Sequence, residues 1–241
     1  MSERFFLAAP PQDGRAVLVD DEARHLVRVL RAKVGAEVRV FDGGGREWTA
    51  RVVTIGRDEV ALEVGDPLPA QAATGPRLTL AVALPKGDRQ KWLVEKLTEL
   101  GTARLVPLVT ARGVAEATDS ARGRLARGVL EACKQCGRNT LMEIGAAATL
   151  ETLPALLPSD AIRLLAHPGG RAFDEVVRPD ARDIVAAVGP EGGFTDEELA
   201  TAERLGFDRV SLGPHILRIE TAAIAIAARI SLLAPEAARR A

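Results

Sequence analysis

The chain has 241 residues, of which 47% are hydrophobic and 27% are charged, and its formal net charge is −1. This composition is typical of a globular protein with a buried core, and it excludes an intrinsically disordered chain. Cys133 and Cys136 are the two cysteines, too few for a disulfide framework. The most apolar stretch, residues 216–234, carries three charged side chains, so it predicts a buried helix and not a membrane span.

The near-neutral total charge does not exclude an RNA partner, because phosphate binding depends on the charge of a local face. Basic side chains are concentrated at residues 24–33 and 122–138. The opening MSERFFLAAP lacks the long apolar core of a signal peptide. We therefore expect a cytoplasmic protein with no membrane association.

The first 66 residues are rich in short strand patterns. We expect strands at residues 4–8, 16–19, 37–42, 47–54 and 59–64. Three successive glycines at 43–45 favour a hairpin turn, since glycine tolerates positive φ. Apolar residues recur at helical spacing over 23–30, after Asp20, which we expect to cap the helix. These patterns predict a small β-barrel with one helix.

Residues 66–76 contain three prolines and little apolar periodicity, and we expect a domain boundary there. Beyond it, apolar strand-like runs alternate with helical stretches. We expect strands at 78–84, 104–109, 161–166, 183–188 and 209–212, and helices at 89–100, 120–136, 172–177, 196–205 and 219–233. Short apolar strands that alternate with helices indicate an α/β domain, with a parallel sheet covered on both faces.

The run GPEGGFT at residues 189–195 follows an apolar strand and precedes an acidic helix start. In parallel α/β sheets, ligands bind at the carboxyl ends of strands, where glycines let the backbone approach them closely. The run matches neither a Walker phosphate loop nor the dinucleotide-binding fingerprint. Two interpretations stay open here: a ligand-binding loop, and a tight turn capped by Thr195.

A second glycine loop, LGPHIL at residues 212–217, follows the last expected strand. Two such loops after two strands favour a shared ligand pocket. Arg218 and Glu220 come next, in an otherwise apolar run. They are either an exposed ion pair at a helix start or functional groups beside the pocket, and their apolar setting favours the second interpretation.

The loop LPKGDRQK at residues 84–91 is strongly basic and follows the first strand of the second domain. It is suited to gripping RNA phosphate, although a solvated helix start has the same composition. His25 stands among Arg24, Arg28 and Arg31, where RNA contact and plain solvation both stay open.

Cys133 and Cys136 form a CxxC motif at the end of an expected helix. Redox pairs of this kind lie at helix amino termini, and zinc needs about four ligands, for which no second CxxC or histidine cluster is present. We therefore expect a structural role for both cysteines and no bound metal. His167 and His215 lie near the expected pocket, but no hydrolase nucleophile motif accompanies them.

Five segments carry a resemblance to a known family. They are HLVRVLRAKVGAEVRVFDG at 25–43, LPKGDRQKWLVEKLTELG at 84–101, EACKQCGRN at 131–139, GPEGGFTDEEL at 189–199 and LGPHILRIETAAIAI at 212–226. In their order and spacing they resemble the RsmE family, whose members methylate N3 of uridine in small-subunit ribosomal RNA. The resemblance covers nearly the whole chain.

The resemblance implies a fold, a cofactor and partners. In this family of the SPOUT superfamily, a small PUA-like β-barrel precedes a parallel sheet with a C-terminal trefoil knot. The two domains correspond here to residues 1–70, an RNA-binding barrel, and 75–241, the methyltransferase domain. The implied cofactor is S-adenosylmethionine (SAM), and the implied partners are 16S ribosomal RNA in the small ribosomal subunit and a second copy of the chain in a homodimer.

The resemblance also implies that SAM lies against the loops of the knot. The corresponding residues here are Leu165, Ala166, Gly189, Pro190, Glu191, Gly192, Gly193, Leu212, Gly213, Ile216 and Leu217. The implied reaction then sets its own requirements for catalytic groups and for RNA contacts.

Uracil N3 is a poor nucleophile while it carries a proton, so we expect a carboxylate to help remove that proton, first Glu220 and second Glu191. We expect Arg218 to stabilise negative charge on the uracil carbonyl oxygens. The expected RNA contacts are basic side chains, namely Arg24, His25, Arg28, Arg31, Lys86, Arg89 and Arg138.

Two other functions fit the same motifs. A SPOUT methyltransferase that acts on the ribose 2′-oxygen of transfer RNA would share the knot loops but would need no base deprotonation. A ribosome-assembly RNA-binding protein that has lost catalysis would keep the fold, although the intact glycine loops disfavour it.

Overall fold

The computed structural model describes residues 3–69, 75–113, 118–178 and 180–233. The chain forms two compact units. The amino-terminal unit comprises Met1–Ala72 and Leu130–Leu141, and the carboxyl-terminal unit comprises Ala73–Val129 and Met142–Ala241. A single boundary at 66–76 does not account for Leu130–Leu141, which groups with the amino-terminal unit although it lies far along the chain.

The amino-terminal unit contains a five-stranded mixed sheet in the order β1-β3-β4-β5-β2. Its strands are β1 (Arg4–Phe6), β2 (Arg15–Val19), β3 (Glu37–Phe41), β4 (Glu47–Ile55) and β5 (Glu59–Pro67). β1 pairs with β3 in parallel, whereas the other three pairings are antiparallel. Buried apolar side chains alternate with more exposed ones along β2 and β5, so one face of the sheet packs on the core around Leu18, Val60 and Leu62.

The expected helix of this unit is divided. It consists of α1 (Asp20–Arg24) and a π-helical turn, η1 (His25–Val29), in which the amide of Leu30 donates to the carbonyl of His25 at 3.1 Å. The expectation that Asp20 caps the helix is wrong. Asp20 is its first residue, at a φ of 51°, and Val19 occupies the N-cap without a side-chain hydrogen bond.

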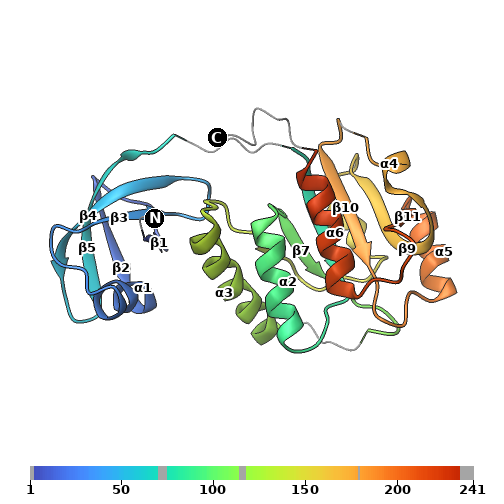
Figure 1. Ribbon diagram of the computed structural model, residues 1–241, viewed down its shortest axis with the longest axis horizontal. Helices are drawn as coiled ribbons and strands as arrows, with labels where there is room; N and C mark the ends of the chain where they lie inside the picture. The colour runs from blue at the N-terminus through green and yellow to red at the C-terminus, as the bar shows by residue number, and fades with distance from the viewer. Residues whose placement is uncertain (1–2, 70–74, 114–117, 179, 234–241) are drawn as a thin grey trace. The chain divides into compact units, whose positions relative to one another are not determined.

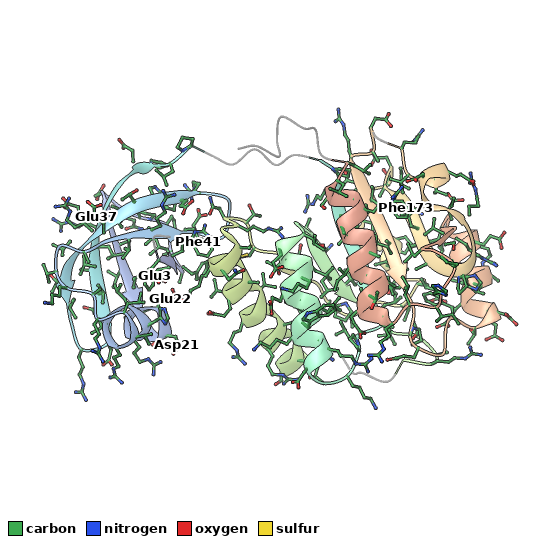
Figure 2. The ribbon with its side chains drawn as sticks, in the orientation of Figure 1. Glu3, Asp21, Glu22, Glu37, Phe41 and Phe173 are labelled. Carbon is green, nitrogen blue, oxygen red and sulfur yellow. The ribbon has the colours of Figure 1, made fainter. Side chains whose placement is uncertain are left out.

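Polar contacts join the segment Leu130–Leu141 to this sheet. The Nη1 atom of Arg4 donates to the carbonyl of Cys133 at 2.7 Å, and the Arg4 guanidinium lies 4.7 Å from the centroid of the Phe41 ring. Lys134 donates to Glu22 at 2.9 Å; Glu22 and Phe41 are both labelled in Figure 2. The segment therefore groups with the amino-terminal unit through partly buried polar contacts, although it lies far away in sequence.

The carboxyl-terminal unit contains a six-stranded parallel sheet in the order β11-β9-β10-β6-β7-β8. Its strands are β6 (Arg77–Val82), β7 (Arg104–Pro107), β8 (Glu143–Ile144), β9 (Ile162–Ala172), β10 (Asp183–Val188) and β11 (Asp208–Ser211). Leu80, Ala81 and Val82 are consecutive and fully buried, as central parallel strands require. The parallel α/β sheet expected from the sequence is confirmed, with β8 as a short additional edge strand.

Helices cover this sheet on both faces. The helices of this unit are α2 (Asp88–Glu99), α4 (Phe173–Val176), α5 (Asp196–Arg204) and α6 (Ile219–Ser231), with a 3-10 turn, η2 (Leu153–Leu156). A further helix, α3 (Asp119–Cys136), begins in this unit and ends in the segment Leu130–Leu141 of the amino-terminal unit. α2 and α6 lie side by side over one face in Figure 1. α5 contributes Leu199 and Ala202 to a separate apolar cluster that includes Val185 and Ala187 of β10. Within the described residues, no helix has the length and apolar character that crossing a membrane requires.

Candidate functional site

A cavity of about 390 Å³ lies beside three adjacent strands, at the carboxyl ends of β10 and β11 and next to residues 166–168 within β9. The ladder between β9 and β11 is interrupted there, since Leu165 pairs with Arg209 but the next pair is Arg171 with Val210. Residues 166–170 therefore have no partner in this ladder, and three of them, Ala166, His167 and Pro168, line the cavity. This size and position are typical of a small-molecule site in an α/β protein.

Three loops and the start of α6 line the cavity. The lining residues are Ala166, His167, Pro168, Val188, Gly189, Pro190, Glu191, Gly192, Gly193, Phe194, Leu212, Gly213, His215, Ile216, Leu217, Ile219 and Ala222. Ten of the eleven residues expected to bind SAM are among them, whereas Leu165 is fully buried inside β9. The structure brings both glycine loops to one cavity, and the residues' contact with a cofactor stays a prediction.

The loop after β10 is held in shape by its own sequence. Thr195 and Glu198 form a reciprocal capping box, in which the Thr195 hydroxyl accepts from the Glu198 amide and the Glu198 carboxylate accepts from the Thr195 amide. A Cβ atom at Gly189 would lie 2.8 Å from the ring of Phe194, so glycine is needed for this close approach. The capped turn and the cavity wall are thus the same segment, and the two interpretations of the motif are compatible.

Arg112 fixes the same loop from outside, and the sequence did not indicate it. Its Nη1 atom donates to the carbonyl of Gly192 at 2.6 Å, and the neighbouring amide of Ala111 donates to Glu198 at 2.8 Å. Arg112 lies in an irregular segment after β7, where no periodicity or motif marks it. Its partner is a backbone carbonyl, which no sequence pattern identifies.

A second arginine connects the two predicted catalytic carboxylates. The Nη1 atom of Arg89 lies 3.2 Å from Glu191 Oε1 and 3.7 Å from Glu220 Oε2. The Glu191 side chain is 46% exposed and lines the cavity, whereas the Glu220 side chain is 6% exposed and is not among the lining residues. Arg218 occupies the N-cap of α6 and is exposed. The sequence had placed Arg89 among the RNA contacts and had not paired it with either glutamate.

The residues expected to contact RNA do not all share one setting. Arg28 and Arg31 are exposed, and Arg24 is exposed and paired with Asp21 of its own helix. His25 is partly buried, with its ring centroid 6.0 Å from that of Phe5.

The remaining expected RNA contacts lie elsewhere in the chain. Lys86 is exposed in the loop after β6. Arg138 is partly buried in the segment that joins the amino-terminal sheet, and burial lowers its pKa. Cys133 is buried and Cys136 exposed, both as free thiols, and the described residues contain no group of three or more metal-binding side chains.

Two family models identify this chain as an RNA methyltransferase. Residues 73–231 match the family model described as an RNA methyltransferase domain, and residues 18–65 match the model described as an RNA methyltransferase PUA domain. The first match covers the whole parallel sheet and every residue that lines the cavity.

Relatives over the full length narrow this class. The chain is 32% identical to ribosomal RNA small subunit methyltransferase E of Rickettsia conorii, over 92% of this chain and 91% of the relative. It is 33% identical to the protein of the same name from Synechocystis, over 94% of this chain and 77% of the relative. The chain therefore belongs to the ribosomal RNA small subunit methyltransferase E family, as the resemblance in its sequence predicted.

A solved structure agrees with this assignment. Ribosomal RNA small subunit methyltransferase E from Neisseria gonorrhoeae, bound to S-adenosyl methionine, is 29% identical and superposes with a TM-score of 0.88. The match covers 97% of this chain and 98% of the Neisseria chain. The two structures thus share both units and not only the methyltransferase domain.

Proposed function

We propose that this protein transfers a methyl group from SAM to N3 of a uridine in 16S ribosomal RNA of the small subunit. The observation that carries the proposal is the cavity at the carboxyl ends of β10 and β11 and beside residues 166–168 of β9, lined by both glycine loops. The proposal is also supported by the structure of the Neisseria relative, which is bound to S-adenosyl methionine.

The residues of the cavity fit a cofactor with an apolar body and several polar groups. The walls combine apolar side chains such as Ile216 and Leu217 with the exposed backbone of the glycine loops. A Cβ atom at Gly213 would meet no atom within 4 Å, so the backbone there faces open space. When bound, SAM supplies a methyl group that is already activated by its sulfonium sulfur. The protein's own task is to hold the acceptor base in line with that methyl group.

The acceptor must also lose a proton, because neutral uracil carries hydrogen on N3. We propose that a carboxylate beside the cavity accepts it. The sequence favours Glu220, while Glu191 is the glutamate that lines the cavity. Arg218, at the N-cap of α6, is proposed to stabilise negative charge on the uracil carbonyl oxygens. The target base must be unpaired or flipped out, since its pairing edge carries the reacting atom.

The proposal extends to the finer architecture and the assembly. We propose that the amino-terminal sheet is a PUA-like barrel, that the segments after β9 form a trefoil knot, and that the enzyme is a cytoplasmic homodimer. Where β9 and β11 resume pairing after the interruption in their ladder, their backbones lie very close together, because a Cβ atom at Gly170 would lie 2.5 Å from backbone atoms of Val210. Such proximity means that one backbone segment passes directly against the other.

The exposed arginines of the amino-terminal unit are proposed to bind RNA phosphates. Replacing Arg24, Arg28 and Arg31 together by Ala should weaken RNA binding and reduce the slope of log K against log salt by about two to three, since each phosphate contact contributes about 0.7–0.9. Filter binding or fluorescence anisotropy at several salt concentrations measures this slope. The matched control is Arg57→Ala, an exposed arginine in the turn between β4 and β5, and an equal change in both variants would contradict the assignment.

The reaction is tested with labelled SAM and small ribosomal subunits from a strain that lacks this gene. After incubation, the RNA is digested and the methylated nucleoside is identified by mass spectrometry. We expect 3-methyluridine. A 2′-O-methylated nucleoside would move the protein to the related ribose methyltransferases, and SAM binding without any transfer to ribosomal or transfer RNA would indicate a non-catalytic assembly factor.

A further inference from the structure

Arg89 lies where two carboxylates meet, one from the loop after β10 and one from α6. A single atom, Nη1, is 3.2 Å from Glu191 Oε1 and 3.7 Å from Glu220 Oε2. Among the described residues, these are the two side chains that pair with Arg89. One guanidinium therefore serves two glutamates, which leaves the trio with a net charge of about −1 at neutral pH.

Glu220 is the buried member of this trio. Its side chain is 6% exposed, and in the described part of the chain its Oε2 atom has no hydrogen-bond donor. Burial of a carboxylate costs free energy unless a nearby cation compensates its charge, and Arg89 is the cation that pairs with Glu220. The ion pair with the buried Glu220 therefore restrains the position of the Arg89 guanidinium.

Glu191 is the accessible member. It lines the cavity, its side chain is 46% exposed, and its hydrogen bond to Arg89 joins it to the trio. An exposed ion pair alone contributes little, because both long side chains lose conformational freedom when they pair. The pairing holds Glu191 in one orientation only if Arg89 is itself held, and the buried Glu220 supplies that restraint.

We propose that Arg89 is a positioning residue, fixed by Glu220, which orients Glu191 to accept the N3 proton of the target uracil. This inference rests on the proposed function, and it assigns the proton to Glu191 and not to Glu220, the residue that the sequence favours. In the step, the N3–H bond breaks, the proton bonds to a Glu191 oxygen, and the electron pair stays on N3. Arg89 then pairs with Glu220 alone, so the trio passes from a net charge of −1 to neutrality.

The test compares the single-turnover rate of methyl transfer in the full-length protein, at saturating SAM and ribosomal RNA, with SAM affinity from calorimetry. Glu191→Gln should slow transfer by about 100-fold or more, as loss of a general base does. Glu220→Gln and Arg89→Met should each slow it by about tenfold or more. The double variant Arg89→Met/Glu220→Gln should be no slower than Arg89→Met, because Glu220 acts through Arg89. Arg89→Lys should recover part of the rate, and the SAM Kd should stay within about twofold of the original in every variant.

Glu197→Gln is the matched control, since Glu197 is an exposed glutamate in the first turn of α5, and it should leave the rate unchanged. Thermal unfolding identifies any variant that fails to fold. Arg89→Met leaves the buried Glu220 carboxylate without its cation and can destabilise the protein for that reason alone. In the double variant Arg89→Met/Glu220→Gln, residue 220 is neutral, so its rate reports the loss of Arg89 without that buried charge.

The proposal is overturned if Glu220→Gln abolishes transfer while Glu191→Gln and Arg89→Met remain near the original rate, because Glu220 would then accept the proton itself. It is also overturned if the losses in Arg89→Met and Glu220→Gln multiply in the double variant, which would mean independent roles. Failure of the proposed function is distinct from both outcomes, since the unmodified protein would then form no 3-methyluridine.

Discussion

Arg4 in the amino-terminal unit and Arg89 in the carboxyl-terminal unit both bind carboxylates, but their surroundings differ. Nε of Arg4 donates to Glu47 at 3.1 Å, and the side chains of both residues are only 10% exposed. Nη2 of Arg4 donates to the Asn139 side chain, whose Nδ2 atom donates to the second oxygen of Glu47 at 3.2 Å. Every polar group in this cluster therefore has a partner inside the fold.

The Arg89 trio is incomplete by comparison. Arg89 is 40% exposed, and the buried Oε2 atom of Glu220 lacks a hydrogen-bond donor among the described residues. A closed polar network rigidifies a fold. The Arg89 trio, by contrast, keeps one member, Glu191, exposed at the cavity. The same pair of residue types thus serves architecture in one unit and, as we propose, catalysis in the other.

The largest expected effect on stability comes from removing Arg4 from its cluster with Glu47 and Asn139. Arg4→Met should lower the free energy of unfolding by about 3 kcal/mol, the lower end of the range for a broken buried ion pair, because Glu47 loses its closest cation and keeps only Arg39 at 3.7 Å. Chemical denaturation followed by circular dichroism measures the loss. Arg24→Met is the control, since the pair of Arg24 with Asp21 is exposed and should contribute at most about 1 kcal/mol. Equal losses in the two variants would remove the distinction between closed and exposed pairs.

An intermediate effect is expected where the backbone beside the cavity is crowded. A Cβ atom at Gly170 would lie 2.5 Å from Val210 backbone atoms, which cannot move aside as a side chain can. Gly170→Ala should therefore destabilise the protein by about 1–3 kcal/mol and lower Tm. At Gly169 a Cβ atom would be 3.5 Å from the His167 ring, an ordinary contact, so Gly169→Ala should leave Tm nearly unchanged. If Gly170→Ala were equally harmless, the contact between β9 and β11 would be looser than its geometry indicates.

The features that the sequence predicted well depend on local pattern. The alternation of apolar strands and helices predicted the parallel sheet, and Thr195 with Glu198 three residues later has the signature of the capping box found there. The glycine loops were placed at strand ends by the same periodicity, and the structure brings them to one cavity.

The features that the sequence did not predict depend on contacts between distant residues. Arg4 and Asn139 are 135 positions apart, so nothing local indicated that Leu130–Leu141 joins the amino-terminal unit. Arg89 and Glu191 are 102 positions apart, and each looked like a separate candidate until the fold paired them. β9 also continues to Ala172, beyond the expected end at 166, and it includes a Pro-Gly-Gly stretch, which is unfavourable in a strand.

Arg112 gives the smallest and most specific test of the cavity region. Arg112→Ala should raise the Kd for SAM by about threefold to tenfold, because its 2.6 Å hydrogen bond to the Gly192 carbonyl holds one wall of the cavity and a charged hydrogen bond at an exposed site contributes about 1 kcal/mol. Tm should change little, in contrast to Arg4→Met, because Arg112 is exposed and leaves no buried charge behind. Isothermal titration calorimetry measures the Kd, with Arg124→Ala on α3 as a control whose partner is the Ser120 hydroxyl. An unchanged Kd would mean that the capping box alone keeps the loop in shape, and the cavity wall would then depend on local sequence as fully as the sheet does.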